Sequence, residues 1–372
     1  MKSAIELIQF EDNRNLLKFV GRGGLTSRSI LHEGIFDQII SLDNLFTAWS
    51  EFRRGKRSKP DVQIFEYTLE DNIFQLHQDL VTGAYCHGSY QQFQITDPKV
   101  RLISKSSVRD RLLHHAIYRT LYPAWDRTFI YDSYSCRNNK GTYKAFARLI
   151  DLTRKVSGNY TRPCWALKLD IRKFFDSVDH EILMDLLKAR IVDEQLLKLL
   201  RNIIDSFEHS PDKGMPLGNL TSQLFANIYL DPLDKFVKRK LKVKYYLRYA
   251  DDFTLLDTDL DRLLGYLIEI NRFLKDNLEL TLHPGKIILR KLNWGIDFVG
   301  YIALSHYNLP RKSTVKRIFR TLTHDMQNNA DLDKSEQSLN SYLGYLKYVN
   351  AYNLSQELVK TIRLVRQLAN QL

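Results

Sequence analysis

Apolar residues recur at intervals of three and four along much of the chain, a spacing that predicts amphipathic helices. Residues 41–83 contain two such stretches, SLDNLFTAWSEF and TLEDNIFQLHQDL. The same spacing returns over residues 109–121, from about residue 180, and over residues 195–207. From Ser313 to the C-terminus it is uninterrupted, so the last part of the chain is expected to form a small helical subdomain.

Alternation of apolar and polar residues predicts strands elsewhere. Residues 88–103 alternate like a hairpin, and CWALKLD (164–170) is an apolar strand that leads into the helix near residue 180. Residues 244–256 alternate on both sides of Ala250–Asp252 and predict a second hairpin. Residues 213–241 should form a loop and then a long helix. Short strands are expected in LTLHPGKIIL (280–289) and GIDFVGYI (295–302).

The composition is that of an ordinary folded protein. Of 372 residues, 44% are hydrophobic and 26% charged, which excludes a disordered chain. No apolar run approaches the ~20 residues that a membrane span needs, and the acidic N-terminus MKSAIELIQFEDNRN is unlike a signal peptide. The three cysteines, Cys86, Cys136 and Cys164, are widely spaced and do not form a zinc motif. We therefore expect a cytoplasmic protein without a membrane partner.

The charge balance points to a polyanionic partner. The formal net charge is +12 and the pI is near 9.4, which favours nucleic acid. Aromatic residues, on which bases can stack, interleave with several of the basic clusters. These clusters are Arg53–Lys59, Lys99–Arg111, Lys235–Lys244 and Arg311–Arg320. The alternative is a generally basic surface that only keeps the protein soluble.

Two adjacent carboxylates stand at the expected tip of the second hairpin, in KYYLRYADDFTLL. Asp251 and Asp252 repel each other, but a hairpin tip lets both stay exposed while the flanking strands are buried. With a third carboxylate, Asp170 at the end of WALKLD, they would supply the oxygen ligands that Mg²⁺ prefers. Two such ions can clamp a phosphoryl transfer. The alternatives are a polar turn for the doublet and a strand-end or helix-capping carboxylate for Asp170.

The order of several motifs resembles that of reverse transcriptases. RYADDF is similar to their Y-x-D-D box, and LKLDIRKFFDSVDH to the preceding motif with its first metal-binding Asp. Six further segments resemble other motifs of these enzymes. KVRLISKSSVRDRLLHHAI resembles the fingers motif, DSYSCRNNKGTYKA the next block of bacterial retroelement enzymes, and GMPLGNLTSQLFANIYL the nucleotide-pocket helix. LTLHPGKIIL then resembles the late palm strands, GIDFVGYI the primer grip, and SYLGYLKYVNAYNL the thumb. The resemblance spans roughly residues 41–372.

The resemblance implies an α+β right-hand polymerase with fingers, a palm with an antiparallel sheet, and an α-helical thumb. The expected division is an N-terminal extension (1–40), fingers with N-terminal helices (41–163), a palm with inserted helices (164–307) and a helical thumb (308–372). Such an enzyme is an RNA-directed DNA polymerase, a nucleotidyltransferase that makes cDNA from dNTPs with two Mg²⁺ ions, or Mn²⁺ in their place.

One segment refines the resemblance. Group II intron enzymes usually carry Q-G-x-x-x-S-P, whereas this chain reads LGNLTSQ at residues 217–223. That form resembles the enzymes of diversity-generating retroelements and the allied "unknown group" of antiphage defence. Their template is a structured non-coding RNA, and their partners are a small accessory protein, a second reverse transcriptase or further copies of the same chain. Two other functions stay open: an RNA-binding scaffold or splicing cofactor without catalysis, and DNA synthesis without a template.

The resemblance also assigns roles around the metal ions. Asp170, Asp251 and Asp252 are the implied metal ligands and catalytic residues, with the carbonyl of Ile171 as a further ligand. Lys286 resembles the late-palm lysine that protonates the leaving pyrophosphate. A solvent-exposed loop lysine is the alternative for Lys286.

Further residues are implied to bind the dNTP. Lys99 and Arg101 match the positions that grip the triphosphate, and their alternative is a solvated basic strand. Phe175 matches the position whose ring excludes a 2′-hydroxyl, and its alternative is core packing, as expected for Phe174. The residues expected to line the nucleotide and template-base pocket are Gly218, Asn219, Ser222 and Gln223. The sequence alone favours hydrogen-bonded structural roles for His114, His115 and His283, and thumb-core packing for Tyr342, Tyr345 and Tyr348.

Overall fold

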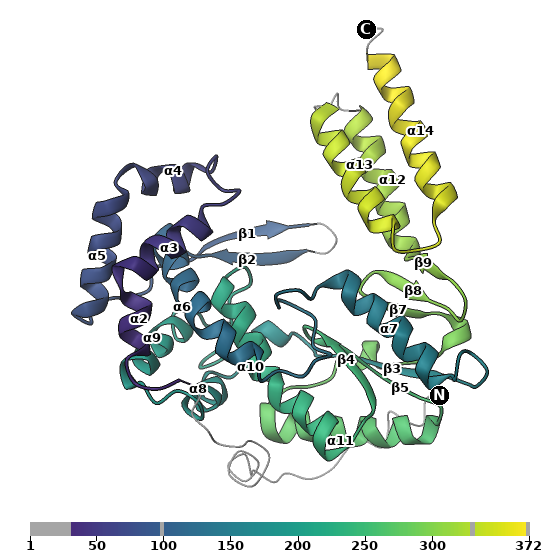
Figure 1. The fold of residues 1–372 in the computed structure, drawn as a ribbon, viewed down its shortest axis with the longest axis horizontal. Helices are drawn as coiled ribbons and strands as arrows, with labels where there is room; N and C mark the ends of the chain where they lie inside the picture. Colours follow the sequence, from purple (N-terminus) through teal and green to yellow (C-terminus); the bar gives the residue numbers. More distant parts are fainter. Residues whose placement is uncertain (1–30, 97–99, 328–331, 370–372) are drawn as a thin grey trace. The chain divides into compact units, whose positions relative to one another are not determined.

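The computed structural model describes residues 31–96, 100–327 and 332–369 (Figure 1). These residues divide into two compact units. Unit 1 holds the described residues of Met1–Arg137, Asp170–Lys244 and Gly265–Lys286. Unit 2 holds those of Asn138–Leu169, Tyr245–Leu264 and Ile287–Leu372. Most of the expected N-terminal extension lies outside the described residues. Within the described part of the chain, no helix has the length and apolar character needed to cross a membrane.

Unit 1 is mainly helical. Its helices are α2 (Ile35–Ile40), α3 (Leu42–Phe52), α4 (Pro60–Tyr67), α5 (Leu69–Val81), α6 (Val108–Asp126), α8 (His180–Lys188), α9 (Glu194–Ile204), α10 (Leu220–Lys235) and most of α11 (Leu260–Leu278). A π-helical turn, Phe236–Lys240, continues α10. The long helix α6 packs against α3 and α10, and it begins where the Ser107 hydroxyl accepts a hydrogen bond from the backbone N–H of Asp110. These helices confirm the periodicity-based predictions for the first half of the chain.

A two-stranded hairpin projects from these helices. Strands β1 (Gln91–Ile95) and β2 (Arg101–Lys105) are antiparallel, with Gln91 opposite Lys105. The backbone N–H of Ser104 donates to the carbonyl of Leu217 at 3.1 Å, which attaches the hairpin to the loop before α10. The predicted hairpin over residues 88–103 is therefore confirmed, and it lies directly over the G-N segment.

Unit 2 contains a four-stranded sheet in the order β4-β5-β3-β6. Its strands are β3 (Trp165–Asp170), β4 (Tyr245–Tyr249), β5 (Asp252–Asp257) and β6 (Ile288–Lys291). Strands β4 and β5 form the predicted hairpin, with Tyr249 opposite Asp252. Helix α7 (Thr142–Val156) packs against both of these strands.

A second sheet in unit 2 corrects one prediction. GIDFVGYI does not form one strand; it forms the tight hairpin β7 (Ile296–Phe298) and β8 (Tyr301–Ala303), and β9 (Asn308–Pro310) adds a third strand. The turn is possible because Gly300 adopts φ +95°, a conformation that favours glycine. Similarly, only the end of LTLHPGKIIL forms a strand, because Pro284–Lys286 is a 3₁₀ turn.

The C-terminal part is helical, as predicted. Helices α12 (Lys312–Gln327), α13 (Leu332–Leu346) and α14 (Tyr352–Ala369) share a small core around Ile318, Leu339 and Leu358. Tyr342 and Tyr345 pack against this core, which confirms their predicted packing role. The same prediction is wrong for Tyr348, which lies beyond the end of α13 and is 46% exposed.

Candidate active site

The carboxylate doublet lies at the tip of the β4–β5 hairpin. Residues 250 and 251 make the turn, and Asp252 begins β5. Ala250 takes φ +53°, an unfavourable value for a residue with a Cβ. The guanidinium of Arg248 is fully buried beneath the turn and donates to the carbonyl of Ala250 at 3.0 Å. This contact holds the turn that presents the two acids.

Lys168 on strand β3 contacts the second carboxylate of the doublet. Its Nζ lies 2.9 Å from Oδ2 of Asp252, and it also donates to the carbonyl of Asp297 at 3.2 Å. The side chains of Lys168 and Asp252 are only 15% and 23% exposed. Lys168 was not among the predicted site residues. Strand alternation could have indicated it, because residues 168 and 170 share one face of β3.

The predicted site residues Asp170, Ile171 and Lys286 lie together in unit 1. Nζ of Lys286 donates to Oδ1 of Asp170 at 2.6 Å, and the backbone N–H of His283 donates to the Asp170 carbonyl at 2.8 Å. Ile171 is buried opposite Leu282. Because the flanking residues make the hydrogen bonds of this bridge, the carbonyl of Ile171 points away from Leu282.

The donor atoms suit a hard divalent cation. Carboxylate and carbonyl oxygens are the ligands that Mg²⁺ takes in proteins, and Asp170 and Asp252 each already attract an ammonium group, from Lys286 and Lys168. No group of three or more His, Cys, Asp or Glu side chains is arranged to hold a metal ion among the residues that the structure describes. The chemistry of the donors therefore fits the expected ion, and the role of these residues as ligands stays a prediction.

A pocket of about 320 Å³ in unit 1 contains several of the predicted nucleotide-binding residues. Gly218, Asn219 and Gln223 line it together with Arg111 and His114. Gly218 has φ +114°, and a Cβ there would come within 3.0 Å of the Ile103 side chain on β2, so the close approach of the hairpin requires glycine. We call this cavity the hairpin pocket.

The amide of Asn219 holds the hairpin in place. Its Oδ1 accepts from the Ser106 hydroxyl at 3.0 Å, and its Nδ2 donates to the carbonyl of Ser104 at 3.4 Å. Ser222 differs from expectation because it lines a different, nearly filled cavity of about 10 Å³ with Thr221 and Phe225. Successive residues of a helix point about 100° apart, which separates Ser222 from Gln223.

Of the remaining predicted residues, Phe175 and Arg101 lie at half-exposed and exposed positions. Phe175 is half-buried, and its ring meets that of Phe174 edge-to-face at 5.3 Å. Phe174 is 2% exposed, as expected for a core residue. Arg101 is exposed at the start of β2. Lys99 lies outside the described residues.

His114 is the feature of the hairpin pocket that sequence reasoning interpreted wrongly. It is buried, and neither ring nitrogen has a hydrogen-bond partner in the described part of the chain. Its ring stacks on that of His87 at 5.3 Å. Burial lowers the pKa of His114 to about 3, and burial also lowers the pKa of His115 to about 4. His114 is therefore a neutral, buried imidazole with unused hydrogen-bonding capacity.

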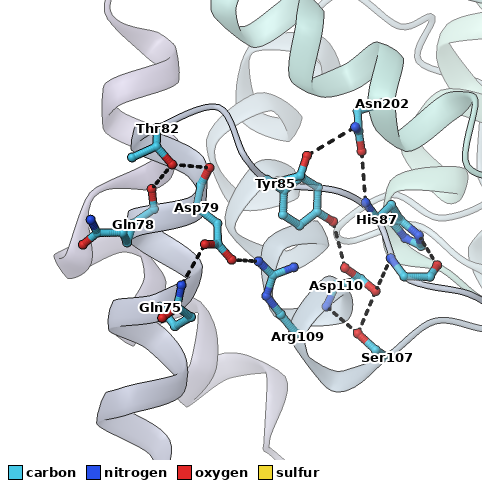
Figure 2. Close-up of polar contacts among 11 residues, drawn as sticks. Gln75, Gln78, Asp79, Thr82, Tyr85, His87, Ser107, Arg109, Asp110 and Asn202 are labelled. Carbon is cyan, nitrogen blue, oxygen red and sulfur yellow. Dashed lines mark hydrogen bonds and ion pairs between the residues drawn. The ribbon is translucent and has the colours of Figure 1, made fainter.

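A polar network fixes the helix that carries His114 (Figure 2). The buried carboxylate of Asp110 accepts from the hydroxyl of Tyr85 at 2.8 Å, from the hydroxyl of Ser107 at 2.7 Å and from the N–H of Gly88 at 3.2 Å. Nearby, Arg109 forms an ion pair with Asp79. These contacts lock the first turn of α6 to the segment before β1, so the position of His114 is set by the fold.

The buried histidine predicts a specific pH dependence of stability. Folding holds His114 neutral down to about pH 3, whereas in the unfolded chain it takes up a proton near pH 6.5. Its stabilising contribution is present above pH 6.5 and is lost as the pH falls toward 3. At pH 5 the loss in the free energy of unfolding should be about 2 kcal/mol.

Urea unfolding at pH 7 and pH 5 measures this loss, with His114→Gln as the matched variant that cannot titrate. The variant should lose less stability than the parent protein between the two pH values. Equal losses in both proteins would show that His114 is not responsible.

The family comparison identifies the class of protein. The family described as reverse transcriptase (RNA-dependent DNA polymerase) matches residues 95–303, more than half of the 372-residue chain. The chain therefore belongs to the reverse transcriptase family, and the expected α+β right-hand fold is confirmed. The matched range contains the carboxylate doublet, Asp170 and the residues of the hairpin pocket that follow Ile95.

Relatives in sequence include intron-encoded proteins. The putative COX1/OXI3 intron 2 protein of Saccharomyces cerevisiae is 22% identical, over 61% of this chain and 33% of that protein. The group II intron-encoded protein LtrA of Lactococcus lactis subsp. cremoris is 28% identical, over 47% of this chain and 30% of that protein. The chain thus spans about a third of the length of these relatives. The expected relation to group II intron enzymes is confirmed.

Among solved structures, telomerase from Candida albicans in complex with a fragment of telomeric RNA has a TM-score of 0.44 to this chain. It is 12% identical, over 78% of this chain and 63% of that one.

Proposed function

We propose that this chain is an RNA-directed DNA polymerase that extends a primer 3′-hydroxyl with dNTPs along an RNA template. The observation that carries the proposal is the family match over residues 95–303, which includes the hairpin that presents Asp251 and Asp252. The net charge of +12 supports an RNA partner.

The family match supports the proposed metal ligands, because residues 95–303 contain all of them. Strand β3 ends at Asp170, its neighbour β5 begins at Asp252, and Lys168 on β3 contacts Asp252. Asp170 shares a face of β3 with Lys168. We assign Asp170, Asp251 and Asp252, with the carbonyl of Ile171, to hold two Mg²⁺ ions, or Mn²⁺.

When bound, such ions activate the attacking 3′-hydroxyl and stabilise the charge on the leaving pyrophosphate. The carboxylates supply the negative charge that attracts them. The ammonium group of Lys286 donates a hydrogen bond to the carboxylate of Asp170, one of the proposed metal ligands. We assign Lys286 to donate a proton to the pyrophosphate as it leaves.

The residues of unit 1 would bind the incoming nucleotide. Lys99 and Arg101 are assigned to the triphosphate, because cationic side chains pair with phosphate oxygens. Gly218 and Gln223 would face the base pair, and Asn219 would act by holding the hairpin over them. We retain Ser222 as a member of the same motif, with an indirect role through the start of α10.

The biological setting is a further part of the proposal. The G-N-x-x-S-Q sequence at residues 218–223 supports cDNA synthesis from a structured non-coding RNA. We propose that this synthesis takes place in the cytoplasm. It is shared by enzymes of antiphage defence and of diversity-generating retroelements. A neighbouring gene for a small basic protein, together with a template–variable repeat pair, would identify the second setting; co-purifying RNA and repetitive cDNA would identify the first.

Primer extension on poly(rA)/oligo(dT) with Mg²⁺ and dTTP tests the activity. We expect extension that depends on the poly(rA) strand. Extension that continues without poly(rA) would instead show template-independent synthesis. No extension on this substrate or on the RNA that co-purifies with the protein would favour the catalytically silent RNA-binding scaffold.

A further inference from the structure

A second cavity lies within unit 2, where the start of α7 meets β8, α12 and α13. Its volume is about 800 Å³, large enough for a nucleotide. Tyrosines dominate its wall, and three cations, Lys140, Lys144 and Arg317, also line it. None of the described residues that line it is acidic. We call it the tyrosine pocket; its tyrosines are Tyr143, Tyr301, Tyr342, Tyr345 and Tyr348.

Two tyrosines of the pocket, Tyr301 and Tyr345, are held in place by stacking and hydrogen bonds. Tyr301 and Tyr345 stack at 4.5 Å with 16° between their planes, and Tyr301 also stacks on Phe146 at 4.7 Å. The hydroxyl of Tyr301 donates to the carbonyl of Tyr345, and that of Tyr345 donates to the carbonyl of Gly300. These hydrogen bonds give the inner rings a structural role.

The outer pair is different because it is open to solvent. Tyr143 and Tyr348 stack at 4.0 Å with 19° between their planes, yet they are 39% and 46% exposed. The start of α7 is held in place by a hydrogen bond between the hydroxyls of Thr142 and Tyr249 at 3.2 Å. The two rings therefore lie face to face, and each stays partly exposed to solvent beside cationic groups.

Solvent-exposed tyrosine rings beside cationic side chains suit a ligand that has both a base and a phosphate. Ring faces stack on nucleobases whatever the base, and cations attract phosphates. A base inside a duplex has both faces covered by its neighbours, so open tyrosine rings select an unpaired or terminal base. We propose that the tyrosine pocket binds an unpaired nucleotide of a single-stranded nucleic acid, by stacking on Tyr143 and Tyr348 with the phosphate near Lys140, Lys144 and Arg317. The inference rests on the proposed function only for the nature of the partner.

Fluorescence anisotropy with a labelled oligo(dA) 12-mer tests the pocket without polymerisation. The full chain carries Asp251→Asn, and dNTPs and divalent ions are omitted, so failure of the proposed catalysis cannot affect the result. An abasic 12-mer has the same phosphates but no bases to stack. We expect it to bind about tenfold more weakly than oligo(dA).

Tyr348→Leu and Tyr143→Leu should each bring oligo(dA) binding close to the level of the abasic oligomer. Tyr352→Leu is the matched control, because Tyr352 is 75% exposed in the same unit and does not line the pocket. Lys144→Gln should weaken binding of oligo(dA) and of the abasic oligomer alike and reduce the salt dependence. If both tyrosine variants, shown to be folded by circular dichroism, bind oligo(dA) as tightly as the Tyr352 control, the proposal is wrong, and the pocket serves another partner or only packing.

Discussion

Asp251→Asn is expected to lower the rate of RNA-templated DNA synthesis by at least about 1,000-fold while the fold is kept. Asparagine has the size of aspartate and is equally suited to a turn, so the contact from Arg248 to Ala250 should persist. What is lost is the negative charge that would attract a divalent cation. Single-turnover primer extension measures the rate, and circular dichroism checks the fold.

Asp257→Asn is the matched control for this substitution. Asp257 ends the same strand that Asp252 begins, and its Oδ1 accepts from the N–H of Asp259 at 3.0 Å, a structural role. Its replacement should change the rate only a few-fold. If Asp251→Asn keeps the activity, or if Asp257→Asn loses as much, the doublet is not the catalytic centre.

Phe175→Val is expected to raise the incorporation of ribonucleotides relative to deoxyribonucleotides by about 100-fold. The ring of Phe175 is half-exposed, whereas its neighbour Phe174 is buried against Tyr229. Only an exposed ring can meet a bound sugar, and shortening it would make room for a 2′-hydroxyl. Discrimination by the shape of a pocket reaches roughly 10- to 200-fold, which sets the expected size.

The ratio of kcat/KM values for dTTP and UTP on one template gives this selectivity. Phe74→Val is a suitable control because Phe74 is also an exposed phenylalanine of unit 1, on α5. A change in stability alone would lower both rates and leave the ratio unaltered. An unchanged ratio for Phe175→Val would support a packing role for this ring.

Local patterns were sufficient to predict most elements of the fold. Alternation on both sides of Asp251 predicted the β4–β5 hairpin, and the apolar spacing after Ser313 predicted α12 to α14. GIDFVGYI misled because a run of apolar residues hides a turn, in which Val299 and Gly300 both take positive φ values. Alternation along a strand predicts which face of the sheet each side chain lies on, but it does not predict well where the chain turns back.

Contacts between distant residues were the part that sequence alone could not supply. Lys168 and Asp252 are 84 positions apart in the chain, yet their charges meet at 2.9 Å. The sequence predicts a hydrogen-bonded structural histidine at His114. The structure shows instead that neither ring nitrogen has a hydrogen-bond partner within the described residues. Tyr348 fits a helical spacing of three, but α13 ends before it, so its ring stays exposed.

Electron paramagnetic resonance of Mn²⁺ bound to the protein, with a dideoxy-terminated primer on an RNA template and the next dNTP, tests the proposed metal ligands directly. The complex of the parent protein should hold Mn²⁺ ions that are lost or bound far more weakly in Asp170→Asn and in Asp251→Asn, and that stay bound in Asp257→Asn. Equal Mn²⁺ binding in all four proteins would contradict the assignment of Asp170 and the doublet as the metal site.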